Sequence, residues 1–217
     1  DMTSSLVGSE MCIRDSNSTV VEDLAGRGVG VIHSPEEAQA GEAVLLRAHG
    51  ASRQVYEALR ARGARIVDAT CPKVARVREI VQQAEGEGRR CVMIGDKNHP
   101  EVAGIAGWCR DLLVFSGPDD LSAAFTEGIL TGDMPLTVVS QTTLIRSVWE
   151  NSLKILKNQC TNLKIFDTIC SATHIRQSEA AEIAAKVDVM VVVGDPKSAN
   201  TKHLTDICRQ YCPRVFQ

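Results

Sequence analysis

Reactive side chains follow several short apolar segments of this chain, at the points where those segments end. The run AVLL (43–46) leads to His49, and the run CVMI (91–94) leads to His99 and Glu101. If these runs are parallel strands of an open α/β fold, their carboxyl ends meet at one edge of a sheet, where ligands bind. Six runs share this feature, and the side chains that follow them are His49; Cys71; His99 and Glu101; Ser140, Gln141 and Thr142; Cys170 and Thr173; and Ser198 and Asn200.

These residue types suit the parts of one chemical site. Thiols such as Cys71 and Cys170 are soft ligands that suit an iron–sulfur cluster or zinc. Histidines, together with Ser and Asn at a helix N-terminus, suit a phosphate-like anion. A glutamate beside a histidine, as at Glu101, can transfer a proton. The sequence therefore predicts a site with soft metal ligands, an anion subsite and an acid.

Some candidate residues also have a purely structural interpretation. His49 precedes a glycine and equally suits a turn. Thr142 and Thr143 suit the cap of the helix that follows, and one of them could serve both as a cap and in the site. The glycine-rich segment GRGVG (26–30) lacks a third glycine and leads into a strand, so it does not indicate a dinucleotide site.

The other cysteines favour structural roles. Cys91, inside RCVMIG, is expected to be a core residue, and Cys109 and Cys160 are expected to be incidental at helix ends. Cys208 and Cys212 are four residues apart on one face of a predicted helix. A packed or surface face is favoured there over a metal-binding pair.

The chain alternates apolar, β-rich runs with helical stretches, which favours parallel sheets with helices on both faces. The runs are almost continuously apolar, as is typical of strands that are buried on both sides. We therefore predict an α/β fold. Strands are expected at 29–32, 43–46, 65–67, 91–94, 112–115, 136–139, 164–166, 189–193 and 214–216, and helices at 19–28, 52–62, 73–86, 118–128, 144–158, 175–187 and 198–211.

Composition excludes several classes of function. The formal net charge is −3 and no basic stripe is present, so nucleic acid is not an expected partner. No apolar run approaches the roughly 20 residues that cross a bilayer, so no membrane association is expected. The chain has eight cysteines and no secretory signal, which predicts a reducing compartment with thiols that are free or metal-bound.

The motifs AHG, DATCP, GDKNHPEVAG, SQTTL, DTICSATHIRQ and GDPKSANTKHL occur in an order and spacing that resemble the 4-hydroxy-3-methylbut-2-enyl diphosphate reductase family. The resemblance runs from about Asn17 to the end of the chain. It implies three small α/β domains arranged as a trefoil around a central iron–sulfur cluster. It also implies an oxidoreductase of the non-mevalonate isoprenoid pathway, which converts (E)-4-hydroxy-3-methylbut-2-enyl diphosphate to isopentenyl and dimethylallyl diphosphate.

The resemblance implies a role for each matching residue. Cys71 and Cys170 would ligate a 4Fe-4S cluster, Glu101 would deliver protons to the leaving hydroxyl group, and Thr142 would orient that group. A ferredoxin or flavodoxin is the implied electron donor, and the cytoplasm, or the plastid of a eukaryote, the implied compartment. The substrate-binding residues would be His49, His99, Thr142, Thr173, Ser198, Ala199 and Asn200.

The chain departs from the family at both ends. Residues 1–16 are interpreted as a non-native segment, and Ser16 stands where the family has a histidine. Cys12 lies too close to Asn17 to be the family's first cluster cysteine, so two ligands are expected instead of three. The expected domains span 17–70, 71–168 and 169–217, and the third is expected to be partial.

Two other classes of function remain open at this stage. The first is a thiol- or metal-binding redox sensor without turnover, or an inactive fragment of the enzyme. The second is an anion-binding α/β domain in which Cys71 and Cys170 are core residues. A sensor would not require the set of His49, His99, Glu101 and Asn200.

Overall fold

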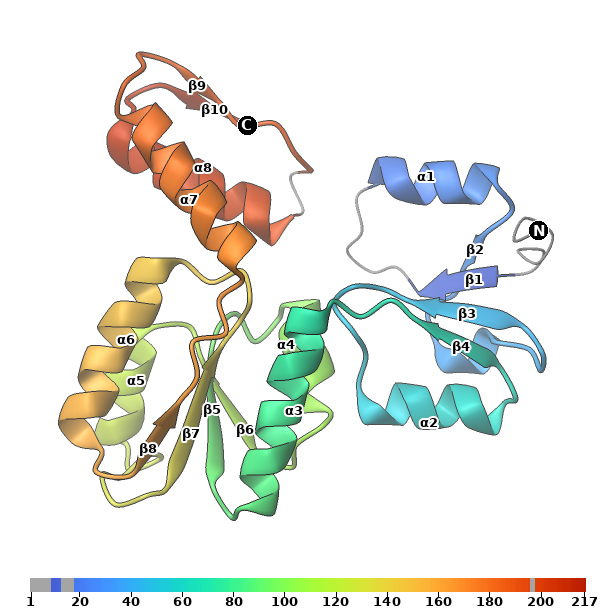
Figure 1. Ribbon diagram of the computed structural model, residues 1–217, viewed down its shortest axis with the longest axis horizontal. Coiled ribbons are helices and arrows are strands. Elements are labelled where there is room, and N and C mark those ends of the chain that lie inside the picture. The colour runs from blue at the N-terminus through green and yellow to red at the C-terminus, as the bar shows by residue number, and fades with distance from the viewer. Residues whose placement is uncertain (1–8, 13–17, 196–197) are drawn as a thin grey trace.

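Three separate parallel sheets organise the chain in the computed structural model, which describes residues 9–12, 18–195 and 198–217 (Figure 1). Every strand pair is parallel, as the predicted α/β class requires. We call the parts built on these sheets the first, second and third units. Among the helices of the described residues, none is both long and apolar enough to span a membrane.

The first unit is a four-stranded sheet in the order β2-β1-β3-β4. Its helix α2 buries Tyr56 and Leu59 against Val44 and Leu46 of the central strand. β1 lies between β2 and β3 within the segment interpreted as non-native, and that interpretation remains a prediction. The elements are β1 (Ser9–Cys12), α1 (Ser18–Gly26), β2 (Gly30–Val31), the short 3₁₀ turn η1 (Pro35–Glu37), β3 (Ala43–Leu46), α2 (Arg53–Ala61) and β4 (Arg65–Asp68).

The second unit is a four-stranded sheet in the order β6-β5-β7-β8, covered by helices on both faces. Helices α3 and α4 cover the face nearer the first unit, while α5 and α6 cover the other (Figure 1). The elements are α3 (Pro72–Gly86), β5 (Arg90–Ile94), α4 (Pro100–Ala106), β6 (Leu112–Phe115), α5 (Pro118–Thr126), β7 (Leu136–Ser140), α6 (Arg146–Gln159) and β8 (Leu163–Ile165).

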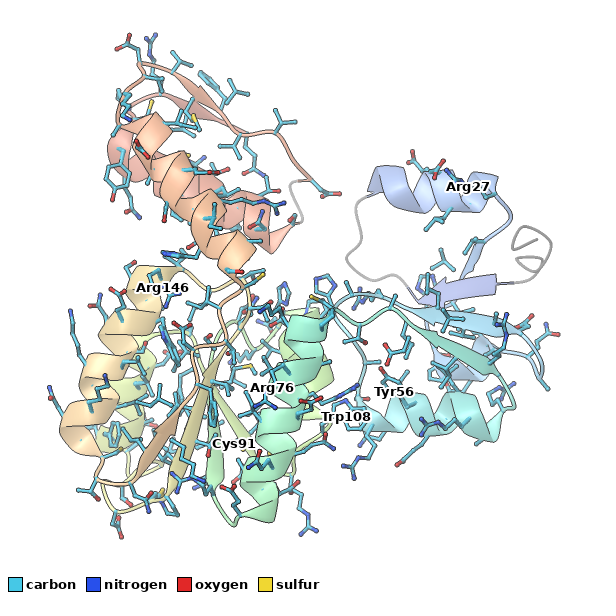
Figure 2. All side chains as sticks on the ribbon, in the orientation of Figure 1. Arg27, Tyr56, Arg76, Cys91, Trp108 and Arg146 are labelled. Carbon is cyan, nitrogen blue, oxygen red and sulfur yellow. The ribbon has the colours of Figure 1, made fainter. Side chains whose placement is uncertain are left out.

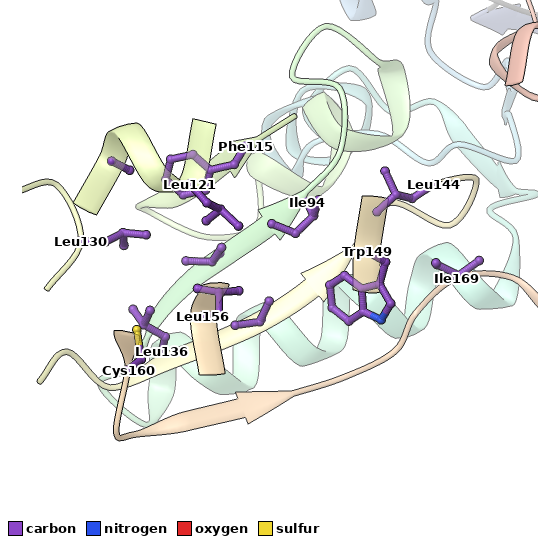
Figure 3. Close-up of a cluster of buried hydrophobic side chains, with 13 residues drawn as sticks. Ile94, Phe115, Leu121, Leu130, Leu136, Leu144, Trp149, Leu156, Cys160 and Ile169 are labelled. Carbon is purple, nitrogen blue, oxygen red and sulfur yellow. The ribbon is translucent and has the colours of Figure 1, made fainter. Parts of the chain in front are cut away.

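The side chains of β5 alternate between the two cores of the second unit, as the pleat of a strand requires. Val92 and Ile94 pack with Trp149 of α6 in the core under α5 and α6, which Figure 3 shows. Cys91 and Met93 point to the opposite core, under α3 and α4. These four side chains are fully buried, which confirms Cys91 as a core residue.

The third unit consists of α7 (Ser171–Ala184), β9 (Met190–Val191), α8 (Ala199–Tyr211) and β10 (Val215–Phe216). Cys208 and Cys212 are buried with Ala184 and Val192 between the helices and the two-stranded sheet. These cysteines therefore pack in a core, as the favoured interpretation expects. The boundaries of the three predicted domains remain predictions.

Candidate functional site

A buried acid–hydroxyl pair lies between two loops at the carboxyl ends of β5 and β7. The Glu101 side chain is 1% exposed and belongs to the first turn of α4. Its two carboxylate oxygens accept from Thr142, one from the backbone N–H at 2.7 Å and the other from Oγ1–H at 2.6 Å. Both residues are buried, so little water reaches this pair.

Burial determines the protonation of the Glu101 carboxyl group. Removal from water disfavours the charged form and raises the pKa of Glu101, and the two hydrogen bonds from Thr142 oppose that rise in part. A carboxyl group with a raised pKa holds its proton closer to neutral pH, where it can act as an acid.

Two histidines from different units contact each other, and one of them caps the helix that carries this acid. The imidazole rings of His49 and His99 meet edge to face, with centroids 5.3 Å apart. His99 is the N-cap of α4, and its Nδ1 accepts from the backbone N–H of Glu101 at 3.2 Å. Since Nδ1 accepts, Nε2 carries the proton of the neutral ring, which makes His99 a hydrogen-bond donor.

The two predicted ligand cysteines each lie at the N-terminus of a helix. Cys71 is the N-cap of α3 and Cys170 is the N-cap of α7, and both thiols are free and partly exposed. The backbone N–H of Cys71 donates to Ala48 at 2.9 Å, next to His49, and that of Cys170 donates to Thr142 at 2.8 Å. Each cysteine is therefore tied by its backbone to a loop that carries another predicted site residue.

Cys71 and Cys170 are donors of the chemical class that binds iron–sulfur clusters, and the thiolate is the form that binds metal. Among the described residues, no group of three or more His, Cys, Asp or Glu side chains could hold a metal ion. Of the expected cluster ligands, the part of the chain that the structure describes contains two, Cys71 and Cys170. Cys12 ends β1, and its side chain lies outside the described residues, as does Ser16.

A cavity of about 410 Å³ is lined by residues of all three units. His49 comes from the first unit, His99 and Thr143 from the second, and Ser198 and Asn200 from the third. Lys202 and His203 add basic groups to its wall, and Asp96 and Asp206 add acidic ones. Four of the residues expected to bind the substrate, His49, His99, Ser198 and Asn200, therefore lie around one space, and Thr142 and Thr173 are not among the residues that line it.

The start of α8 brings the third unit to this cavity. Ser198 is the N-cap of α8, and its Oγ accepts from the backbone N–H of Thr201 at 3.4 Å. Thr173 is buried in the first turn of α7, close in sequence to Cys170. Ala199 begins α8, but its side chain lies outside what the structure describes.

Sequence reasoning did not single out His203. This residue lies one turn beyond Asn200 on α8, and its Nδ1–H donates to the Thr143 carbonyl group at 3.0 Å. The contact joins the third unit to the loop after β7. The spacing of Asn200 and His203, three residues apart on a predicted helix, was the available signal, because such residues share a face.

Two of the candidates at the end of β7 have structural contacts. Ser140 Oγ lies 3.0 Å from Thr168 Oγ1, and Gln141 Oε1 accepts from the backbone N–H of Asp96 at 3.0 Å. Both side chains are buried. They hold neighbouring loops of the site together.

Comparison with known proteins gives consistent results along the chain. A family model described as LytB protein matches residues 13–217. The 4-hydroxy-3-methylbut-2-enyl diphosphate reductase of Caldanaerobacter subterraneus subsp. tengcongensis is 41% identical over 204 residues, which are 92% of this chain and 68% of that protein. The protein of the same name from Clostridium acetobutylicum is 37% identical over 198 residues, which are 90% of this chain and 30% of that protein.

Solved structures share the fold. The E-1-hydroxy-2-methyl-but-2-enyl-4-diphosphate reductase of Plasmodium falciparum superposes with a TM-score of 0.88 at 26% identity, over 97% of this chain and 66% of that one. A structure of (E)-4-hydroxy-3-methyl-but-2-enyl diphosphate reductase, described as the terminal enzyme of the non-mevalonate pathway, gives 0.71 at 31% identity. It covers 98% of this chain and 75% of its own.

Proposed function

The chain belongs to the LytB protein family, and from this premise we propose that it catalyses the reductive dehydroxylation of (E)-4-hydroxy-3-methylbut-2-enyl diphosphate. Its relatives are named as the reductase, an oxidoreductase. The substrate takes up two electrons and two protons, the allylic C–O bond breaks, and water leaves. The remaining carbon skeleton is isopentenyl or dimethylallyl diphosphate.

The diphosphate group is proposed to bind in the cavity shared by the three units. His49 and His99 provide ring N–H donors, and Ser198 and Asn200 provide polar groups at the start of α8. A helix N-terminus favours an anion without a large basic patch, which agrees with the modest net charge of the chain. The backbone at Ala199 and the hydroxyl group of Thr173 are proposed to complete the substrate-binding set.

Glu101 is proposed as the acid that protonates the leaving hydroxyl group. The observation that carries this proposal is the buried Glu101–Thr142 pair, with both oxygens of the carboxyl group held by one threonine. The Thr142 Oγ1 can turn from the carboxyl group to the substrate oxygen and orient it. Once the C–O bond breaks, the proton from Glu101 leaves with the hydroxyl group as water.

Cys71 and Cys170 are proposed to hold an iron–sulfur cluster, which supplies electrons to the allylic system when it is bound. The thiols themselves act as ligands, and α3 and α7 orient them from their N-termini. A ferredoxin or flavodoxin is proposed as the external electron donor.

A redox sensor without turnover is less well supported. Such a protein needs the two thiols but has no need of a buried acid beside two histidines. The reductase relatives also do not favour it.

The proposal is tested by separating substrate binding from turnover in the Glu101→Gln variant. Glutamine keeps the size of the side chain and cannot act as an acid. We expect substrate binding within about threefold of the parent, and turnover with a chemical reductant to fall by about 100-fold or more, the scale of a lost general acid. Binding is measured by calorimetry under anaerobic conditions and turnover by product formation.

The matched control is Glu57→Gln on the exposed face of α2, which we expect to leave both quantities unchanged. Parent-like turnover in Glu101→Gln would remove the acid from the mechanism. Loss of substrate binding in Glu101→Gln would instead assign Glu101 to recognition.

A further inference from the structure

Helix α4 carries site residues at one end and contacts the first unit along its length. His99 and Glu101 lie at its N-terminus, and Gly104, Gly107 and Trp108 lie near its C-terminus. The last three contact the segment 49–52, which begins with His49. One short helix thus touches both histidines of the proposed diphosphate site.

The two glycines allow the backbones to approach closely. A Cβ atom added at Gly104 would lie 3.4 Å from the carbonyl oxygen of His49. A Cβ atom added at Gly107 would overlap Ser52 Cβ and lie 2.9 Å from Ser52 Cα. The first position is tight, whereas the second leaves no room for a side chain unless the segment 49–52 moves.

Trp108 fixes the same segment from the first unit's side. Its Nε1–H donates to the Ala51 carbonyl oxygen at 2.7 Å, and its ring packs against the hydrophobic core of the first sheet. The Arg78 guanidinium group lies 4.6 Å from the ring centroid, and the Tyr56 ring meets it edge to face at 5.4 Å. Figure 2 shows Tyr56 and Trp108 side by side where the first and second units meet.

The segment 49–52 is also packed closely on the side that faces away from α4. Gly50 has a φ of 72°, which L-amino acids with side chains rarely adopt, and a Cβ atom there would lie 3.2 Å from Thr70. Thr70 precedes Cys71 in the chain. The segment that carries His49 is therefore held between α4 and the loop of Cys71.

We infer that Gly104, Gly107 and Trp108 are positioning residues that seat the segment 49–52 on α4 and so set the spacing of His49 and His99 for a diphosphate. The inference rests on the proposed function for the identity of the anion. The physical reason is geometric: His99 is fixed to α4 by its cap, and His49 reaches it only because the segment lies directly on the same helix. A bulkier residue at 107 displaces His49 and leaves His99 in place.

The test measures inorganic pyrophosphate binding to the whole chain by calorimetry. We expect Gly107→Ala to weaken binding by about tenfold, which corresponds to about 1.4 kcal/mol. Trp108→Phe, which removes the hydrogen bond to Ala51 and leaves a smaller aromatic ring, should weaken pyrophosphate binding in the same direction by less. Gly86→Ala is the control, because nothing lies within 4 Å of a Cβ atom at Gly86 at the end of α3.

A double-mutant cycle separates positioning from general damage. In the parent, His49→Ala and His99→Ala should each weaken pyrophosphate binding by about tenfold or more, the scale of a charge-assisted hydrogen bond. In the Gly107→Ala background, His49→Ala should add less than about threefold while His99→Ala keeps its full effect. Equal effects of both histidine substitutions in the two backgrounds would overturn the inference.

A ligand-free measurement keeps the inference separate from the proposed function. Nuclear Overhauser contacts between the rings of His49 and His99 should be present in the parent and Gly86→Ala, and lost in Gly107→Ala. If the contacts are lost only in Gly107→Ala but the parent does not bind pyrophosphate, the positioning role of Gly107 is supported and the proposed diphosphate site is wrong. If the contacts persist in a folded Gly107→Ala variant, the inference that Gly107 positions His49 is wrong.

Discussion

Glu101 has few sources of charge compensation inside the protein. Its carboxyl group is buried, and the two hydrogen bonds that reach it come from a single neutral residue, Thr142. Burial dominates over these bonds and raises the pKa. These bonds favour the charged form less than an arginine or lysine in contact with the carboxyl group would, so the effect of burial prevails.

This arrangement predicts a particular dependence of stability on pH. A raised pKa in the folded state adds stability that is fully present below the unfolded-state pKa of about 4.3 and is lost as pH rises through the folded-state pKa. The stability of the parent relative to Glu101→Gln should therefore fall as pH rises from about 4 towards neutral pH. Thermal unfolding of both proteins across this range measures the difference.

The exposed-site variant Glu57→Gln corrects for the general effect of removing one negative charge. A stability difference between parent and Glu101→Gln that stays constant, or grows in favour of the parent with rising pH, would show that the buried carboxyl group is not destabilised in its charged form.

At the scale of elements, the strand pattern was the most predictable feature. The expected strands at 43–46 and 112–115 agree with β3 and β6 to the residue, because apolar runs bounded by polar breaks define them well. Helix α4 was not expected: seven residues are too few to display a helical period, and Gly104 lowers helix propensity. β9 spans two of the five residues expected, since its pairing is limited to Met190 and Val191 opposite β10.

Helix α7 begins earlier than its apolar pattern indicates. Its first residue is Ser171, four residues before the start expected at Ile175, and Cys170 occupies the N-cap position without a side-chain capping hydrogen bond. Its apolar pattern is weak there, so periodicity alone places the start too late. The early start is what brings Cys170 to the end of a helix.

The segment that follows α4 contacts strand β5, and this contact leads to a further prediction. Cys109 is half-buried against Cys91 of β5, and its interaction with the Cys91 thiol lowers the pKa of Cys109 to about 7. A backbone hydrogen bond from Asp111 acts in the same direction, while burial and the charges of Glu85 and Asp111 oppose it. Its alkylation by iodoacetamide should therefore rise most steeply near neutral pH and level off above about pH 8.

Peptide mapping reads out this prediction directly. Trypsin cleaves after Arg90, Lys97 and Arg110, so Cys91 and Cys109 fall in separate peptides. Cys91→Ala removes the side chain that interacts with the Cys109 thiol and should slow alkylation of Cys109 near pH 7. If the rate at Cys109 continues to climb above pH 8, as for an ordinary thiol of pKa about 8.5, the thiol pair is not formed.

At the scale of the whole molecule, loops from three sheets meet at one site. The rule that ligands bind at the carboxyl ends of parallel strands was enough to select the residues, and His49, His99, Ser198 and Asn200 do line one cavity. Strand patterns could not predict which side chains pair across it. The contact of Glu101 with Thr142 joins residues 41 apart in the chain, and that of His203 with Thr143 joins residues 60 apart.

These long-range pairings depend on tertiary packing within the second unit and between the second and third units, which local patterns do not encode. The family motifs supplied part of that information, since they imply roles for Glu101 and Thr142 at one hydroxyl group. His203 and the glycines of α4 were not selected, because their role lies in joining units.

The central claim, that Cys71 and Cys170 serve a common iron–sulfur site, is tested most directly by anaerobic reconstitution. The whole chain is incubated with iron, sulfide and a small thiol that completes the iron coordination, and bound iron is examined by Mössbauer spectroscopy. Cys109→Ser is the control, because Cys109 is a free and partly exposed cysteine like the two proposed ligands. The account predicts an iron–sulfur signal in the parent and in Cys109→Ser that is lost in both Cys71→Ser and Cys170→Ser; no signal in the parent, or an undiminished signal in either ligand variant, would contradict it.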